Sequence, residues 1–273
     1  MPYKALLNTA LFPALFVLAL VLTLALAVPA HAEPEDDDDN PGTDTWALHV
    51  GVAAVTQPEF IGAEENQFNM LPFIRAYYRF DENNEFYLSG NKGGYNHRFN
   101  HNWKVGIGLT GTQGRNSDND SRLAGMPDIG TAIEIGPWVQ YRFKDTKLRA
   151  LLRYDISGQH DGQSVDFEAK QKIRLKPGIH FNAYAGTSWA DADYMDTFFT
   201  VTPGQAVAGR PAYNASSGFY KANLGASFNY GLRKDVFIVV DGKVQRLLGD
   251  AADSPVTYSN TNFIGYIGLG YTF

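Results

Sequence analysis

Residues 163–176, which read QSVDFEAKQKIRLK, carry the pattern that decides the fold of this chain. Apolar side chains recur at every second position, at Val165, Phe167, Ala169, Ile173 and Leu175. Charged side chains fill positions between them, at Asp166, Glu168, Lys170, Lys172 and Arg174. Period two is typical of a β-strand whose two faces meet different surroundings. Similar alternation over residues 46–53, 133–143 and 148–156 predicts an all-β protein with many such strands.

The composition excludes several other classes of protein. The 273 residues are 14% aromatic and only 19% charged, with no cysteine and a net charge of −6. A disordered chain has few aromatics and high charge, and a coiled coil needs heptads. Without cysteine there is no disulfide scaffold or thiolate metal site. The acidic balance argues against a nucleic-acid partner.

The first 32 residues predict export. Lys4 precedes an apolar run over residues 10–28, and Ala30-His31-Ala32 follows it, as in a cleavable signal peptide. An uncleaved membrane anchor is the alternative, because the run is long enough to span a bilayer. Residues 33–45 form an acidic segment that we expect to be a flexible leader. A calcium site or a docking tail is the sharper alternative for this leader.

Two folds fit strands that alternate in this way: a soluble sandwich, or a transmembrane antiparallel up-and-down barrel over residues 46–273. Three features favour the barrel. Most predicted strands are ten to thirteen residues long, whereas soluble strands usually have about five or six. Aromatic residues gather near strand ends, as in the interfacial girdles of barrels. The chain also ends on an alternating strand that resembles the C-terminal assembly signal of outer-membrane barrels, formed here by Ile267, Leu269, Tyr271 and Phe273.

The turn pattern predicts about twelve strands. Five short turns alternate with longer breaks at residues 56–67, 113–130, 158–164, 190–217 and 249–261, and a sixth outer turn is needed near residues 90–94. An even count places both termini in the periplasm. If the 90–94 hairpin is absent, ten strands remain. Residues 196–202 look strand-like, which predicts a small hairpin inside the 190–217 loop. The 113–130 and 190–217 loops could fold inward as a plug or present a binding surface.

Loop segments resemble those of the MipA/OmpV family of outer-membrane proteins. One combines Gly114-Arg115 and Ser117-Asp118 with LAGMPDI at residues 123–129, and a second is RLLGDAADSP at residues 246–255. Residues 194–220 are similar too. The family-like positions are Arg115, Asp118, Gly125, Met126, Asp128, Leu247, Gly249, Asp250, Ser254 and Pro255. The resemblance implies a bacterial outer-membrane barrel and carries over no catalytic residues. One branch is described as a scaffold between a lytic transglycosylase and a penicillin-binding protein, and others as porin-like, adhesive or stress-related.

The residues themselves predict neither catalysis nor a metal or cofactor. Ser157, His160 and Asp161 are close in sequence, but on one strand end they would not converge into a catalytic set. We expect residues 160–162 to be a polar loop tip. His97 and His101 flank a short turn and offer at most two ligands, whereas structural zinc needs four.

Charged residues on the lumen face are the strongest candidates for function. We expect a ladder of mixed sign formed by Arg75, Arg79, Glu134, Arg142, Arg149, Arg153, Asp155, Asp166, Glu168, Lys170, Lys172, Arg174, Asp241 and Lys243. Cross-strand ion pairs could close the interior, or the ladder could set the selectivity of a narrow pore for small polar solutes.

Three functions follow as hypotheses. The first is a non-enzymatic scaffold that links the outer membrane to murein-remodelling enzymes, an expectation that comes from the resemblance. The second is a narrow porin-like channel, and the third is a barrel hydrolase. The expected surroundings are outer-membrane lipid and lipopolysaccharide, with the barrel-assembly machinery acting on the last strand.

Overall fold

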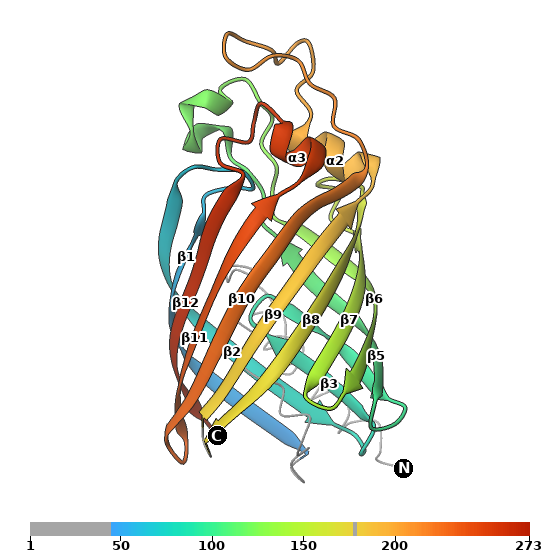
Figure 1. The fold of residues 1–273 in the computed structure, drawn as a ribbon, viewed down its shortest axis with the longest axis vertical. Helices are drawn as coiled ribbons and strands as arrows, with labels where there is room; N and C mark the ends of the chain where they lie inside the picture. The colour runs from blue at the N-terminus through green and yellow to red at the C-terminus, as the bar shows by residue number, and fades with distance from the viewer. Residues whose placement is uncertain (1–44, 177–178) are drawn as a thin grey trace, which may run out of the picture.

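A computed structural model describes residues 45–176 and 179–273, without the side chains of residues 119 and 174–176. The expected signal peptide, and the leader except for Thr45, lie outside these residues. Twelve strands form the fold, which confirms the predicted count (Figure 1). They are β1 (Trp46–Pro58), β2 (Asn66–Arg79), β3 (Asn84–Ser89), β4 (Lys92–Arg98), β5 (Trp103–Thr112), β6 (Ala132–Phe143), β7 (Thr146–Asp155), β8 (Gln163–Lys176), β9 (Ile179–Ala190), β10 (Gly218–Arg233), β11 (Val236–Leu247) and β12 (Thr261–Thr272).

Each strand pairs antiparallel with its neighbours in sequence, and β1 pairs with β12 to close the barrel. At this seam the register runs from His49↔Thr272 to Thr56↔Gly265. Side chains strengthen the seam near the long loops, where Asn66 Nδ2 donates to the Phe263 carbonyl at 3.0 Å and Asn262 Nδ2 to the Ala63 carbonyl at 2.8 Å. Closure leaves the sheet without a free first or last strand, as a lipid-exposed sheet requires.

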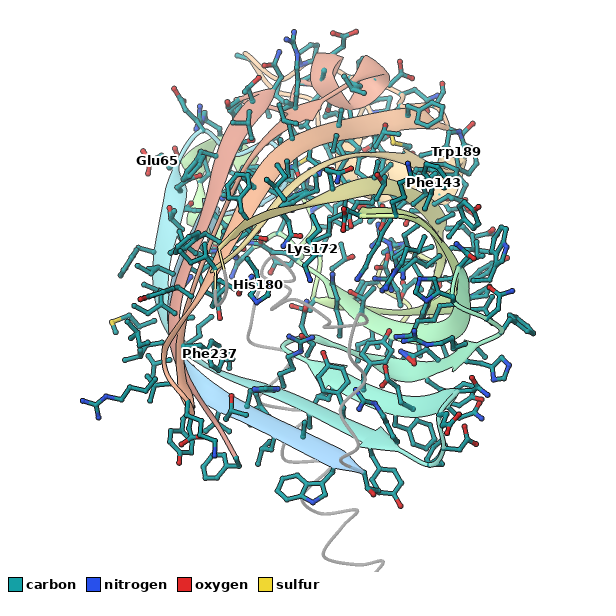
Figure 2. The ribbon with its side chains drawn as sticks, turned by 60° about the horizontal axis from the view of Figure 1, so that its bottom comes forward. Glu65, Phe143, Lys172, His180, Trp189 and Phe237 are labelled. Carbon is teal, nitrogen blue, oxygen red and sulfur yellow. The ribbon has the colours of Figure 1, made fainter. Side chains whose placement is uncertain are left out.

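The two faces of the barrel wall differ as the alternation predicts. Residues that pair across strands share a face, so the outer surface carries apolar side chains such as Phe68, Leu224 and Ile267, each more than half exposed. The inner surface carries polar and charged side chains, and Figure 2 shows Lys172 and His180 pointing into the lumen. An apolar exterior around a polar interior is typical of membrane-spanning barrels.

Glycines in the strands make room for inward-facing rings. A Cβ atom at Gly225 would lie 2.5 Å from the Tyr184 ring, and one at Gly106 would lie 2.6 Å from the Trp138 indole. The barrel therefore uses these glycines to pack aromatic side chains inside the lumen, which is a structural role.

The two ends of the barrel are built differently. Residues 80–83, 99–102, 144–145 and 234–235 make short turns at one end, here named the turn end. Thr45 and Phe273 lie at that end too, bonded to Arg79 and Leu48 respectively. Long loops over residues 59–65, 113–131, 156–162, 191–217 and 248–260 gather at the opposite end, here named the loop end. The periplasmic location of the termini stays a prediction.

Short helices occur in the long loops: α2 (Ala192–Phe199), α3 (Gly249–Asp253), η1 (Ser117–Asn119) and η2 (Ser121–Leu123). Figure 1 shows α2 and α3 at the upper end of the barrel. Within the described ranges, no helix combines the length and the apolar character needed to cross a membrane.

Candidate functional site: a capped, charged lumen

The long loops fold into a cap that has its own apolar core. Phe198, Phe199 and Met195 of α2 are buried against Tyr220 and Leu247 from the ends of β10 and β11. A second cluster joins Phe60, Leu123, Met126, Val201 and Val256, which come from four different loops. Aromatic burial on this scale holds the loops together by the hydrophobic effect, at roughly 1.5–3 kcal/mol per large side chain. The loop end is therefore covered by packed structure.

The strand-like interpretation of residues 196–202 is wrong for residues 196–199, which belong to helix α2, whereas Val201 forms an antiparallel bridge with Tyr213 inside the loop. The Asp191 carboxylate accepts from the Tyr194 N–H at 3.0 Å and caps the helix N-terminus. Apolar side chains at Tyr194, Met195, Phe198 and Phe199 then lie on one helical face, which packs into the cap. An extended backbone would send Phe198 and Phe199 to opposite sides, so burial of both favours the helix.

The first family-like segment ties the cap together. The Arg115 guanidinium is buried and donates from Nη1 to the Phe198 carbonyl at 3.0 Å. Burial lowers the pKa of Arg115 to about 10. The Asp128 carboxylate accepts from the backbone and hydroxyl of Ser117, both at 2.7 Å, and these bonds hold its pKa below its usual range. Met126 is in the second cluster, Gly125 has a φ of 80°, and Asp118 lies in η1.

The second family-like segment contacts the same cap from the other side. Leu247 is in the first apolar cluster, and the Ser254 hydroxyl donates to the Phe199 carbonyl at 2.6 Å. The Asp250 carboxylate accepts from the Ser216 N–H at 2.7 Å. Gly249 has a φ of 51° at the start of α3, and Pro255 follows that helix. The residues that carry the family resemblance thus build the cap, and most of them are outside the charged lumen.

His160 was expected at a polar loop tip, and this prediction is wrong. Its ring is buried beneath α2, with ring centroids 4.9 Å from Tyr194 and 5.7 Å from Phe198. Its Nε2 lies 3.1 Å from the Glu134 carboxylate. The loop folds back because the Asp155 carboxylate accepts from the backbone N–H groups of residues 159, 160 and 161. Sequence alone could not place α2 over this loop.

Ser157 and Asp161 do not complete a catalytic set with His160. The Ser157 hydroxyl donates to Asp155 Oδ1 at 2.7 Å, while His160 Nδ1 accepts from the Gly162 N–H at 3.1 Å. The side chain that holds His160 is Glu134, from another strand. His97 Nδ1 lies 2.8 Å from Asn84 Oδ1. The described residues contain no group of three or more histidines and carboxylates placed to hold a metal.

A buried network closes part of the upper lumen. Glu134 on β6 pairs with Arg153 on β7, and Arg153 Nε lies 2.9 Å from Asp166 Oδ2 on β8. Thr112 and Ser188 extend the network on either side, donating to Glu134 at 2.6 Å and to Asp166 at 2.5 Å. Glu134 and Arg153 are taken out of water and depend on their partners for compensation, whereas the Asp166 side chain is partly exposed.

The strand register places the expected charge ladder on the inner face. Cross-strand pairs include Arg149↔Glu168, Glu134↔Asp155, Arg142↔Lys147 and Lys172↔Asn182. Toward the turn end, the Arg79 and Lys104 side chains both contact Glu85 at 3.2 Å, and the Arg75 and Arg149 guanidinium groups each lie 4.7 Å from an aromatic ring centroid, of Tyr77 and Trp138. The backbone of Arg174 pairs with His180, and its side chain lies outside the described residues. The ladder is thus split between ion pairs and an open compartment.

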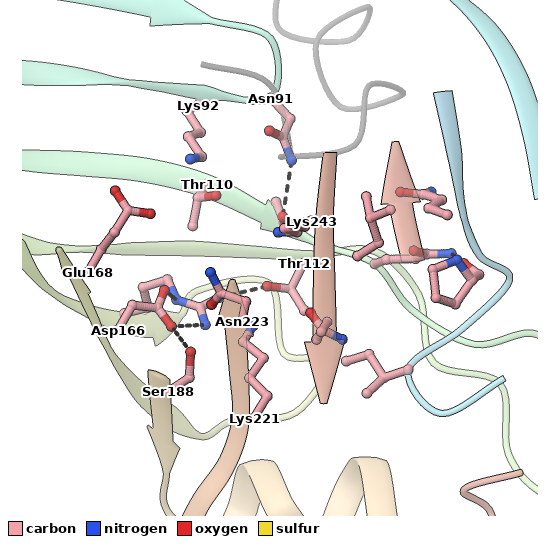
Figure 3. Close-up of a pocket in the computed structure, with 18 of the residues that line it drawn as sticks. Asn91, Lys92, Thr110, Thr112, Asp166, Glu168, Ser188, Lys221, Asn223 and Lys243 are labelled. Atoms are coloured by element: carbon pink, nitrogen blue, oxygen red, sulfur yellow. Dashed lines mark hydrogen bonds and ion pairs between the residues drawn. The ribbon is translucent and has the colours of Figure 1, made fainter. Parts of the chain in front are cut away.

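The open compartment is a cavity of about 520 Å³ beneath the cap. Phe60, Ile61 and Tyr194 line it from the cap, and strands from around the barrel line the rest. Lys92, Lys221 and Lys243 reach it from β4, β10 and β11, as Figure 3 shows, and Lys170 lines it from β8. The cavity carboxylates are Asp166, Glu168 and Asp241, of which Asp166 pairs with Arg153 and Asp241 accepts from Tyr184 at 2.8 Å.

A second cavity of about 80 Å³ continues toward the turn end. Lys92, Glu168 and Lys170 line both cavities and therefore stand at their junction. Arg75, Lys104 and Arg149 line the smaller one.

Sequence reasoning missed several charged lumen residues: Glu85, Lys92, Lys104, Lys147 and Lys221. The register places them inward, because Lys92 pairs with Thr110 and Lys221 with Leu247 and Ser188. Counting every second residue from Asp241 through its partner Ser227 on β10 would have found Lys221. The other residues needed the exact bounds of β3, β4, β5 and β7.

The final strand presents its alternating residues outward. Ile267, Leu269, Tyr271 and Phe273 are all exposed, and the Tyr271 and Phe273 rings pack edge-on at 4.8 Å. Their use as an assembly signal stays a prediction.

A closed antiparallel barrel with an apolar exterior and a charged lumen defines a protein of the outer-membrane barrel class. The chain belongs to the family described as MltA-interacting protein MipA, whose profile matches residues 50–273. It is 27% identical to outer membrane protein Omp26La of Vibrio anguillarum, over 68% of this chain and 74% of that protein. It is 26% identical to OmpV of Vibrio cholerae serotype O1, over 66% and 71% of the two chains. The chain is therefore an outer-membrane protein.

Solved structures of porins match the chain at much lower sequence identity. The NanC porin matches with a TM-score of 0.43 and 12% identity, over 82% of this chain and 98% of NanC. OmpF of Salmonella typhi, solved with daunomycin, matches with a TM-score of 0.40 and 11% identity, over 84% and 97%.

Proposed function

We propose that this barrel is a narrow channel that passes small anionic solutes through the cavity beneath its cap. The observation that carries the proposal is the convergence of Lys92, Lys221 and Lys243 on that cavity from separate strands. Arg153 is compensated by Glu134 and Asp166, which leaves four cavity lysines facing Glu168 and Asp241. In a partly desolvated compartment this excess of positive charge favours anions.

Single-channel recording of the chain from residue 33 onward in planar bilayers tests this function. Under a salt gradient we expect low conductance with anion selectivity. The triple variant Lys92→Glu, Lys221→Glu, Lys243→Glu should reverse the sign of the reversal potential, because six units of charge change inside the cavity. A matched triple at exposed turn-end positions, Lys144→Glu, Arg233→Glu, Lys234→Glu, makes the same charge change and should leave the sign unchanged. Silence from a folded, heat-modifiable barrel would refute the channel.

A scaffold for murein-remodelling enzymes is the second candidate. It is favoured by the family description, which names interaction with MltA, and by the acidic segment at residues 33–44. The short turns at the turn end offer a large partner little surface, which counts against it. Affinity capture with the purified barrel should retain a lytic transglycosylase or a penicillin-binding protein. Deletion of residues 33–44 should reduce the capture if the acidic segment is the docking element.

We propose no catalytic role for the Ser157, His160 and Asp161 region. His160 is buried, and its two ring nitrogens contact Glu134 and the Gly162 N–H. Such engagement favours a structural histidine over a general base. Hydrolysis of lipid or peptide substrates that disappears in His160→Ala but persists in a His97→Ala control would contradict this.

A further inference from the structure

Among the described residues, the wall of the barrel is incomplete next to β2. Strand β2 runs from Asn66 to Arg79, but it pairs with β3 only over Arg75–Arg79. Strands β3 and β4 contain six and seven residues, and their hairpin turns at Gly90 and Asn91. Over residues 66–73, the described chain therefore provides β2 with a ladder partner on its β1 side alone.

The missing strand halves leave an opening of definite size. Neighbouring strands lie about 4.8 Å apart, so two absent strands separate β2 from the next wall segment by roughly 14 Å. Along β2, residues 66–73 extend roughly 23 Å at about 3.3 Å per residue. These are distances between backbones, and the side chains that line the opening occupy part of this space.

Hydrogen bonds fix the lower and upper boundaries of this opening. Below it, the Gly90 N–H donates to the Ile74 carbonyl at 3.0 Å, and Asn91 Nδ2 to the Gly111 carbonyl at 3.1 Å. Above it, Gln113 Nε2 donates to the Pro58 and Glu59 carbonyls at 3.3 and 2.5 Å. The opening therefore lies between the hairpin and the cap, and we name it the wall port.

The wall port leads into the lysine-lined cavity. Gln67, Asn69 and Leu71 on the free side of β2 line that cavity, together with Asn91 and Gln113 at the boundaries. These three β2 side chains are half-buried, whereas Phe73 and Arg75, lower on the same face, are 4% and 5% exposed. The inner-face side chains of β2 are thus more exposed beyond the point where β3 ends, as expected if water reaches them through the port.

The chemistry of the free edge also indicates water. Unpaired backbone groups in lipid cost several kcal/mol each, but they are tolerated where they line a water-filled cavity. Pro72 lies in the stretch that pairs with β1 but has no described partner on the β3 side, and proline is confined to edge strands because it lacks an N–H donor. On the outer side of the same stretch, Phe68 and Met70 are 68% and 69% exposed. The port therefore combines a polar inner edge with an apolar outer rim.

We propose that the wall port is the entrance to the cavity, so that small anions enter sideways beneath the cap while the cap stays closed. This inference rests on the proposed channel function and names its route. The cap packs over the loop end, where Phe60, Phe199 and Tyr220 are each at most 1% exposed in the two apolar clusters. Entry through the wall requires no unfolding of these clusters.

The absence of cysteine makes the route testable by thiol labelling. A reporter cysteine at Asn223, an inward-facing cavity residue, is exposed to a small anionic methanethiosulfonate reagent in proteoliposomes. Adding Leu71→Trp should fill the port and slow labelling severalfold. The matched control Met70→Trp places the same ring on the outer face of the same strand and should leave the rate unchanged. Equal rates in all three proteins would overturn the port.

A second arm separates failure of the port from failure of the channel. Labelling needs only access to the cavity, so its Leu71→Trp dependence can be observed even if bilayers show no conductance. In bilayers, reaction of the same reagent with Asn69→Cys at the port should remove most of the current, while reaction with Ser121→Cys on the exposed cap should not. Block through Ser121→Cys with an unaffected Asn69→Cys current would establish an axial entrance instead.

Discussion

The loop end and the turn end of this barrel solve the same problem, the reversal of a strand, in different ways. At the turn end a few polar residues suffice, as at residues 81–84, where Asp81 accepts from the Asn83 N–H at 2.8 Å. At the loop end the connections cooperate to bury two apolar clusters. Turn-end aromatics such as Phe99 and Phe143 are 64% and 57% exposed, whereas Phe60 and Phe199 are 1% and 0% exposed.

This difference shows where the molecule concentrates its specific structure. The short turns require only local hydrogen bonds, whereas the packed cap requires complementary side chains from loops that are far apart in sequence. We therefore expect substitutions at the two ends to differ sharply in effect.

The largest effect is expected at the network beneath the cap. Glu134→Ala removes the partner of His160 and one of the two carboxylates that compensate the buried Arg153, which should cost about 3 kcal/mol of folding free energy. Urea unfolding in detergent micelles, followed by loss of the fast-migrating folded band on gels, measures this. The control Glu82→Ala, at an exposed turn-end position, should unfold like the parent protein. Comparable losses in both variants would contradict the contrast between the ends.

A more local effect is expected from Phe199→Ala. The fully buried ring leaves a cavity in the cap, and the expected cost is about 3 kcal/mol. Because the cap contacts the strands only at their ends, protease cleavage within residues 191–217 should increase while the barrel itself stays folded. The matched turn-end substitution Phe99→Ala should change neither the folding free energy nor the protease cleavage. Global unfolding by Phe199→Ala would show that cap and wall form one cooperative unit.

The smallest effect is a pH dependence in the 113–131 loop. Hydrogen bonds from Arg122, chiefly from its side chain, lower the pKa of Asp120 below its ordinary 3.8. A carboxylate with a depressed folded-state pKa stabilises the fold above the unfolded value and loses this contribution as pH falls through the folded value. Protease nicking of the loop should therefore rise below about pH 3.8. In Asp120→Asn the nicking should be high at every pH, and a parent-like profile in that variant would assign the titration elsewhere.

The strands were predictable because the environment of a membrane barrel imposes a strict two-residue period. In strand β8, every second residue from Asp166 to Lys172 is charged, so the inner face of this strand could be identified directly from the sequence. The twelve-strand count followed from parity, and the hairpin near residue 90 was placed correctly although its strands are short. The depth at which that hairpin ends was not predictable, since it depends on the register with β2 and β5.

The cap was beyond sequence reasoning for a different reason. Residues 192–199 have helical apolar spacing, but the aromatic and threonine residues at 198–202 favour strand locally. The choice is made by burial against Tyr220 and Leu247, which lie on distant strands. His160 was misplaced for the same cause, because its environment comes from α2 and Glu134 rather than from its neighbours in sequence.

The loops on either side of the β1–β12 seam link formation of the cap to the order in which the barrel assembles. The Tyr258 N–H donates to the Gly62 carbonyl at 2.8 Å, and the rings of Phe60 and Tyr258 meet edge-on at 6.1 Å. These groups belong to the first and last long loops, so they meet only after the final strand has docked beside the first. A native cap therefore indicates that β1 and β12 have paired and the barrel has closed. Once formed, it also slows reopening of the seam, because separating β1 from β12 requires disrupting the second apolar cluster.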